Sequence, residues 1–241
     1  MTPPPIFDDI CTQVRFQLDG ATGTSPGNPR GIADFVARVT SDALRVYPTT
    51  VPHVHDCVER VIGRLGITVT PEVYIQNEVS TNACALMTGT TERLVVVINS
   101  GLVNLLSARE LDFVVAHEFG HLGMKHGGTP QDGVTEKNEF AFLRQQSVSR
   151  CHEVSADRVG LVGSQSINTA AQVIMKLASG LSTENLNLDV DAFIQQLDRS
   201  PAEMSRGWEL AMSHPSLPLR LWALIRFSHS LEYNRLTGKG E

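Results

Sequence analysis

The stretch best suited to chemistry is "VVAHEFGHLGMKH", residues 114–126, in which His117 and His121 lie four residues apart inside an apolar run. On an α-helix, residues i and i+4 project from the same face, so both imidazoles can bind one metal ion. Glu118 lies one step around the helix, where it can reach a metal-bound water but is poorly placed as a ligand. This is the HExxH arrangement of zinc hydrolases. The alternative is a helix that buries two histidines in its core.

A second set of candidate ligands lies in "CHEVSAD", residues 151–157, on another segment with a helical pattern. Glu153 and Asp157 are four residues apart and can both face the first helix. Glu153 would complete three protein ligands and leave a fourth position for water, as a catalytic zinc site requires. Asp157 would accept the outer N–H of a ligand histidine. The alternative is that both carboxylates face solvent. His152 projects about 100° away from Glu153 and is not expected to be a ligand.

Other histidine patterns are weaker. The longer motif HExxHxxGxxH needs a glycine and a third histidine at positions that here hold Met124 and Gly127. His126 is one position out of register and is expected to be exposed to solvent. In "HVHDC" (53–57) the two histidines do not share a helix face, so surface residues are favoured over a second metal site.

Helices and strands must bring the two motifs together. Asn28 followed by Pro29 predicts a helix that is closed by Pro48, and a second helix is predicted from about 52 to 65. The pattern then changes to period two, which predicts strands at 67–75, 83–89 and 93–99. The apolar run of 93–99 indicates the central strand, whereas Pro71 places the first strand at an edge or interrupts it.

The helix that carries the histidines has a clear start. Ser107 and Glu110 form a capping box, and apolar side chains then recur at helical spacing. This helix should end at Gly127–Gly128. From residue 139 onward the pattern is helical, with breaks predicted near residues 163, 180–185, 200–201 and 214–218.

Composition excludes several other classes of protein. The 241 residues are 41% apolar and 19% charged, which is typical of a folded globular chain. A net charge of −6 argues against a nucleic-acid partner. The four cysteines are scattered, so no disulfide framework is expected. The sequence shows no signal peptide and no apolar run of the roughly 18 residues that a membrane span needs. These features predict a soluble, cytoplasmic protein with no membrane partner.

HEFGH (117–121) followed by EVSAD (153–157) is similar to the gluzincin pattern, and it resembles the M48 family of metallopeptidases more closely still. The similarity extends upstream through "TNACALMTG" and the strand after it, and downstream to "SHPSLPLRLWAL" (213–224), so it covers roughly residues 67–226. The resemblance implies that one Zn²⁺ ion is bound by three residues and that a carboxylate acts as general base and then acid. The ligands would be His117, His121 and Glu153, and the base would be Glu118.

The same resemblance assigns further roles. His214 would stabilise the oxyanion, and Arg220 would orient the loop of His214 or the helix of Glu153. The strand at 83–89 would bind the backbone of an extended peptide through Asn82, Ala83 and Ala85.

The expected fold class is α+β: zincin-like, mostly helical, with a small mixed β-sheet packed on the HExxH helix. Residues 1–66 are expected to form an N-terminal helical segment that packs on a catalytic domain of residues 67–241. The expected function is zinc-dependent cleavage of peptide bonds in extended or unfolded polypeptide, with Glu118 acting on a zinc-bound water. Two alternatives stay open: a zinc-stabilised binding module without turnover, and a maturation or self-processing peptidase whose cleft is occluded by residues 1–28.

Overall fold

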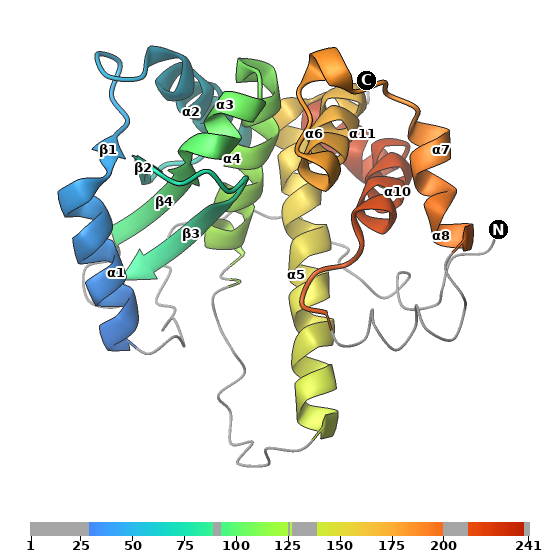
Figure 1. Ribbon diagram of the computed structural model, residues 1–241, viewed down its shortest axis with the longest axis horizontal. Coiled ribbons are helices and arrows are strands. Elements are labelled where there is room, and N and C mark those ends of the chain that lie inside the picture. The colour runs from blue at the N-terminus through green and yellow to red at the C-terminus, as the bar shows by residue number, and fades with distance from the viewer. Residues whose placement is uncertain (1–28, 89–92, 125, 127–138, 200–211, 239–241) are drawn as a thin grey trace.

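The computed structural model describes residues 29–88, 93–124, 126, 139–199 and 212–238. A small β-sheet with its helices occupies one side of the molecule, and a helical half occupies the other (Figure 1). In chain order, the elements are α1 (Pro29–Asp42), β1 (Leu44–Arg45), α2 (Pro52–Leu65), β2 (Glu72–Gln76), β3 (Ala83–Thr88), β4 (Arg93–Asn99), α3 (Ser100–Leu105), α4 (Ala108–Gly123), α5 (Glu139–Ser164), α6 (Ile167–Ser179), the 3₁₀ turn η2 (Thr183–Asn185), α7 (Val190–Ile194), α8 (Gln196–Arg199), α10 (Leu217–Ser228) and α11 (Leu231–Thr237).

The sheet is mixed, with the strand order β1-β2-β4-β3. β4 is central, as predicted, because β2 pairs with it in parallel and β3 pairs with it antiparallel. Successive side chains of a strand point to opposite faces. Val95 and Val97 therefore pack in a small cluster with α1, whereas Val96 and Ile98 lie in the main core with α2 and α4. Helices cover both faces of the sheet, and β3 is an edge strand within the described chain.

The end of α1 differs from the prediction. The helix was expected to continue to Pro48, but it ends at Asp42, because Leu44 and Arg45 leave it to pair with β2 as strand β1. The Arg45 guanidinium also lies 3.4 Å from the Glu72 carboxylate. Cross-strand contacts thus override a helical pattern whose intrinsic preference is small.

The first predicted strand is shorter than expected. Instead of 67–75, β2 covers Glu72–Gln76, so Pro71 interrupts the pattern rather than lying within the strand. Proline has no N–H to donate to a ladder, which accounts for a strand that begins immediately after it. The predicted boundary between an N-terminal segment and a catalytic domain at residue 66 stays a prediction. Residues 1–28, which were considered as a segment that occludes the cleft, lie outside the described chain.

Helix α4 carries the HExxH residues and is buried along most of its length. The predicted capping box is present: the Glu110 N–H donates to the Ser107 hydroxyl, and the Ser107 N–H donates to the Glu110 carboxylate at 2.7 Å. The buried ammonium of Lys176 on α6 donates to the same carboxylate at 2.8 Å. The first turn of α4 is therefore capped by Ser107 and also held to α6 by the ion pair between Glu110 and Lys176.

The C-terminal end of α4 comes earlier than predicted, at Gly123 rather than at Gly127–Gly128. The His126 N–H donates to the His121 carbonyl at 2.9 Å, five residues back. A hydrogen bond of this span closes helix C-termini rather than continuing them. The turn brings the side chain of His126 back toward the last turn of the helix.

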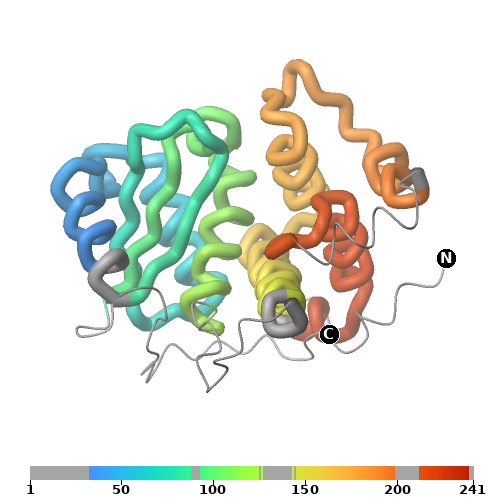
Figure 2. Tube along the Cα trace, turned by 60° about the horizontal axis from the view of Figure 1, so that its bottom comes forward, coloured from blue at the N-terminus to red at the C-terminus, as the bar shows by residue number. Residues whose placement is uncertain are grey.

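Helices α4 and α5 approach each other closely because small residues lie between them. A methyl group on Gly163 of α5 would overlap the side chain of Ala116 on α4, and one on Gly160 would lie 2.9 Å from Phe113. Figure 2 shows the two helices side by side, with the sheet on one side of them and the C-terminal helices, from α6 onward, on the other. This packing sets the HExxH face of α4 opposite the acidic motif of α5. The architecture is the α+β, zincin-like class that the sequence predicted.

The breaks predicted in the helical half near 163, 180–185 and 214–218 match the end of α5, the end of α6 and the start of α10. Gly180 adopts φ 68°, the left-handed conformation that favours glycine at a helix end. The break predicted at 200–201 falls outside the described chain.

Candidate metal centre

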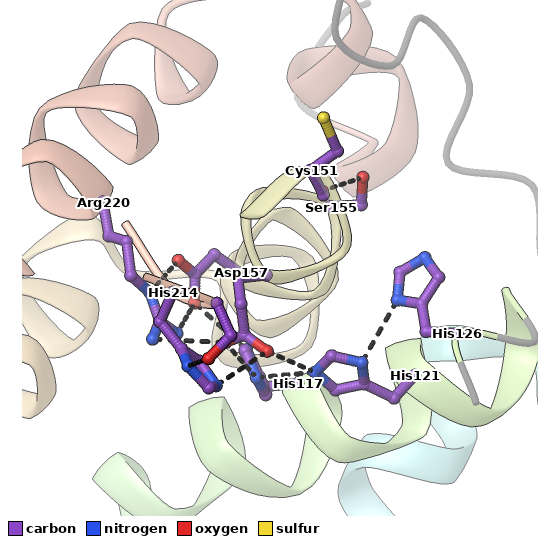
Figure 3. A network of polar contacts seen from close by, with 10 residues as sticks. His117, His121, His126, Cys151, Ser155, Asp157, His214 and Arg220 are labelled. Atoms are coloured by element: carbon purple, nitrogen blue, oxygen red, sulfur yellow. Dashed lines mark hydrogen bonds and ion pairs between the residues drawn. The ribbon is translucent and has the colours of Figure 1, made fainter. Parts of the chain in front are cut away.

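The three predicted metal ligands converge on one point. His117 and His121 project from successive turns of α4 toward α5 (Figure 3), and Glu153 comes from the facing part of α5. The Nε2 atoms of the two histidines are 3.1 Å apart. The Glu153 carboxylate oxygens lie 3.6 Å from Nε2 of His117 and 3.4 Å from Nε2 of His121. Within the described chain, this is the only group of three or more His, Cys, Asp or Glu side chains whose ligand atoms gather within 4.8 Å.

These distances fit a tetrahedral metal ion. Bonds of about 2.0–2.1 Å to nitrogen and oxygen in a tetrahedron place neighbouring ligand atoms about 3.3 Å apart. The observed separations of 3.1, 3.4 and 3.6 Å lie on both sides of that value. Two imidazoles and a carboxylate are also the donor set of catalytic zinc sites.

The tautomer of His117 agrees with this role. Its Nδ1 lies 3.0 Å from an Asp157 carboxylate oxygen, and an ionised carboxylate can only accept. Nδ1 of His117 must therefore carry a proton, which leaves Nε2 as the nitrogen that would bind a metal ion. The structure thus brings Asp157 to the outer nitrogen of a candidate ligand, where the sequence placed it.

Asp157 is buried at the centre of a charged network. Arg220 of α10 donates to its two carboxylate oxygens at 2.7 and 2.6 Å, and another guanidinium nitrogen lies 3.3 Å from Glu153. Burial alone would raise the pKa of Asp157, but Arg220 and His117 hold it below its usual value. Burial likewise disfavours the charged form of His117, yet the Asp157 and Glu153 carboxylates raise its pKa overall. Asp157 is therefore a stable carboxylate that can accept from His117.

Glu118 is buried beside the candidate ligands and faces the same cavity. Burial raises the pKa of its carboxyl above the ordinary value, although His117 and His121 favour the charged form. A carboxyl group with a raised pKa is suited to accept a proton and return it near neutral pH. The cavity has a volume of about 250 Å³ and is lined by Thr81, Asn82, Ala83, Leu102, Phe113, Val114, His117, Glu118, His121, Glu153, Leu177, His214 and Arg220.

His214 lies at the rim of this cavity and is largely exposed. Its Nε2 is 3.5 Å from a Glu153 oxygen, and its Nδ1 is 2.8 Å from the Ser213 hydroxyl. It is not the N-cap of the helix that follows, because that position is Ser216. The exposed imidazole of His214 can donate a hydrogen bond to a molecule bound in the cavity.

The predicted substrate-binding residues lie at the start of β3. Asn82 and Ala83 line the cavity, whereas Ala85 packs against the main core instead. The Asn82 carbonyl accepts from the Asn99 N–H at 3.0 Å, which fixes this end of β3 to β4. Of the three predicted substrate-binding residues, Asn82 and Ala83 therefore lie at the cavity and Ala85 does not.

The expectation for His126 was wrong. It was predicted to be exposed to solvent, but it is half-buried, and its Nδ1 lies 3.2 Å from Nδ1 of His121 (Figure 3). Burial, with His152 and His121 nearby, lowers its pKa to about 3. The His152 ring stacks on that of His126 with centroids 4.1 Å apart. His126 is one position away from the third histidine of the longer motif, so it was excluded as a ligand. The structure instead places it beside Nδ1 of His121, the nitrogen that faces away from the other candidate ligands.

The fold is of the α+β, zincin-like class, and the candidate metal site lies between α4 and α5. The sequence model of Peptidase family M48 matches residues 48–227, and the chain belongs to that family, as the resemblance predicted. No solved structure matches the chain. Among the described residues, no helix combines the length and hydropathy needed to traverse a lipid bilayer.

Two curated proteins are similar to the chain. The plastoglobule-localized metallopeptidase 48 of Arabidopsis thaliana is 30% identical over 190 residues, which cover 69% of this chain and 54% of the relative. A protease HtpX homolog of Ralstonia nicotianae is 27% identical over 232 residues, which cover 80% of this chain and 79% of the relative. The chain thus spans about half the length of the plant relative and about four fifths of the bacterial one.

Proposed function

We propose that this chain is a zinc-dependent metalloendopeptidase that cleaves peptide bonds in extended or unfolded polypeptide. The observation that carries the proposal is the convergence of His117, His121 and Glu153 on one point, with the buried carboxyl of Glu118 in the same cavity. Zinc held by these three residues would lower the pKa of water and polarise the scissile carbonyl.

The remaining steps belong to side chains of the protein. Glu118 accepts a proton from the attacking water and delivers it to the leaving amine. His214, at the rim, donates a hydrogen bond to the carbonyl oxygen as that oxygen gains negative charge; such a donor contributes about 3 kcal/mol to transition-state stabilisation. Arg220 touches no reacting atom in this scheme, and it positions Asp157 and Glu153 through its ion pairs.

The substrate would bind as an added strand. β3 pairs with β4 on one side only within the described sheet, and its first residues line the cavity. An extended peptide at that edge would be bound through its backbone, with Asn82 and Ala83 beside the scissile bond. Binding through the backbone depends little on the side chains of the peptide, and it requires a segment that is unfolded or extended. Ala85 would contribute only its backbone.

The proposal is tested by zinc analysis and casein cleavage of the purified protein before and after chelation. We expect about one zinc per chain, loss of cleavage on chelation and recovery on adding zinc. Glu118→Gln should keep zinc and abolish cleavage, whereas Glu59→Gln, at an exposed position of α2, should change neither. Cleavage by Glu118→Gln with zinc bound would remove Glu118 from the reaction.

Other outcomes separate the alternatives. Zinc binding without cleavage by the wild-type protein would indicate a metal-stabilised binding module. Faster cleavage by residues 29–241 than by the full chain would indicate occlusion by residues 1–28. A cytoplasmic location and the absence of membrane and nucleic-acid partners stay predictions, which fractionation of cells expressing the chain would test.

A further inference from the structure

His126 and His152 form a stacked pair beside the candidate ligands, and the proposed reaction uses neither. Their ring centroids are 4.1 Å apart and the rings are inclined by only 8°. His126 follows the C-terminal end of α4, and His152 lies on α5 immediately before Glu153. The pair therefore joins the two helices that carry the ligands, on the side of His121 away from His117.

The contact between His126 and His121 requires a defined tautomer. Their Nδ1 atoms are 3.2 Å apart, so one must donate and the other must accept (Figure 3). Nε2 of His121 faces His117 and Glu153 at 3.1 and 3.4 Å, which makes it the nitrogen on the metal side. Nδ1 of His121 must then carry the proton, and Nδ1 of His126 is the acceptor.

We propose that His126 is a positioning residue for His121, and this inference rests on the proposed zinc site. Its Nδ1 accepts the Nδ1–H of His121 and selects the tautomer whose Nε2 points at the metal. Asp157 does the same for His117 at 3.0 Å, so each ligand histidine has a partner on its outer nitrogen. His152 keeps the ring of His126 in the required plane by stacking on it.

The test distinguishes the effect of the Nδ1 acceptor of His126 from the effect of its aromatic ring. His126→Phe keeps an aromatic ring but has no acceptor, whereas His126→Asn keeps an acceptor near the Nδ1 position. His152→Phe keeps the stack, and His53→Phe changes an exposed histidine of α2 as a control. Zinc affinity of each full-length variant is measured by competition with a chelating dye, and circular dichroism melting of the metal-free forms checks folding.

We expect His126→Phe to bind zinc about 10- to 100-fold more weakly than wild type. His126→Asn, His152→Phe and His53→Phe should stay within about threefold of it. Wild-type affinity in His126→Phe would overturn the inference, and so would equal losses in the Phe and Asn variants. If His126→Phe does not fold, His126→Leu supplies a second side chain without an acceptor.

A measurement on the wild-type protein is independent of any substitution. In the zinc-loaded form, imidazole ¹⁵N shifts and couplings should show His121 protonated at Nδ1, with that proton hydrogen-bonded to a nitrogen. A His121 with Nδ1 unprotonated would overturn the inference. A wild-type protein that binds no zinc would instead overturn the proposed function.

Discussion

Arg220 and Asp157 form a buried bidentate ion pair, with nitrogen–oxygen distances of 2.7 and 2.6 Å, that ties α10 to the helix carrying Glu153. Removing the guanidinium would leave a buried carboxylate without its main partner, which costs about 3–5 kcal/mol of folding free energy. Arg220→Leu should lower the denaturant midpoint of the metal-free protein accordingly. Arg235→Leu breaks an exposed pair with Glu232 and should change the midpoint little. Equal midpoints for the two variants would contradict a structural role for Arg220.

Zinc content depends on Glu153 if it is the third ligand. Glu153→Ala should lower the stoichiometry after dialysis against a weak chelator, because only two protein ligands remain. Glu184→Ala, at an exposed site in the 3₁₀ turn η2, serves as the control. An unchanged stoichiometry in Glu153→Ala would place the third ligand elsewhere.

Gly163 should tolerate no side chain, although it lies in a helix. Replacing a helical glycine by alanine ordinarily stabilises a protein by about 0.5–1 kcal/mol, and this gain is expected for Gly63, where nothing lies within 4 Å. At Gly163 the new methyl overlaps the side chain of Ala116, and we expect a loss of about 1–3 kcal/mol. Combining Gly163→Ala with Ala116→Gly should recover part of that loss. Chemical unfolding of the four proteins checks all three expectations.

Gly101 holds the loop that leads into β3. A methyl group there would overlap the Val79 carbonyl and approach that of Ser80 to 3.1 Å. The Gly101 N–H also donates to the Glu78 carbonyl at 2.9 Å, so the loop is packed and bonded against the start of α3. Gly101→Ala should displace the loop and the adjoining Asn82. We expect a higher KM for a peptide substrate with unchanged zinc content; an unaltered KM would show that the loop does not position the substrate.

The Glu72 cluster should make stability depend on pH. Hydrogen bonds from Arg93, together with Tyr74 and Arg45, lower the pKa of Glu72 from 4.5 to about 2. Because the folded value lies below the unfolded one, this group stabilises the fold above pH 4.5 and loses its effect as the pH falls toward 2. The contribution is about 1–2 kcal/mol.

Glu72→Gln should therefore flatten that part of the curve of unfolding free energy against pH. The exposed Glu59→Gln should leave the curve unchanged. A wild-type slope retained in Glu72→Gln would assign the acid sensitivity to other carboxylates.

The sequence predicted those features that depend on local spacing. The capping box at Ser107 and the central strand β4 follow from spacing and apolar pattern, and both are present. The gathering of Glu153 with the HExxH histidines joins two helices; it was expected from the resemblance to the M48 family, and the three side chains do gather. The end of α1 was missed because Arg45 is held by β2, a contact distant in sequence. The burial of His126 was missed for a similar reason, since its stacking partner His152 belongs to another helix.

The candidate metal ligands are brought together by the packing of α4 against α5 at Gly163 and Ala116 and by the ion pair between Arg220 and Asp157. Zinc fingers, by contrast, collapse when their ion is withdrawn. We therefore expect the metal-free chain to stay folded, with its candidate ligands already gathered, so that binding of an ion needs no refolding.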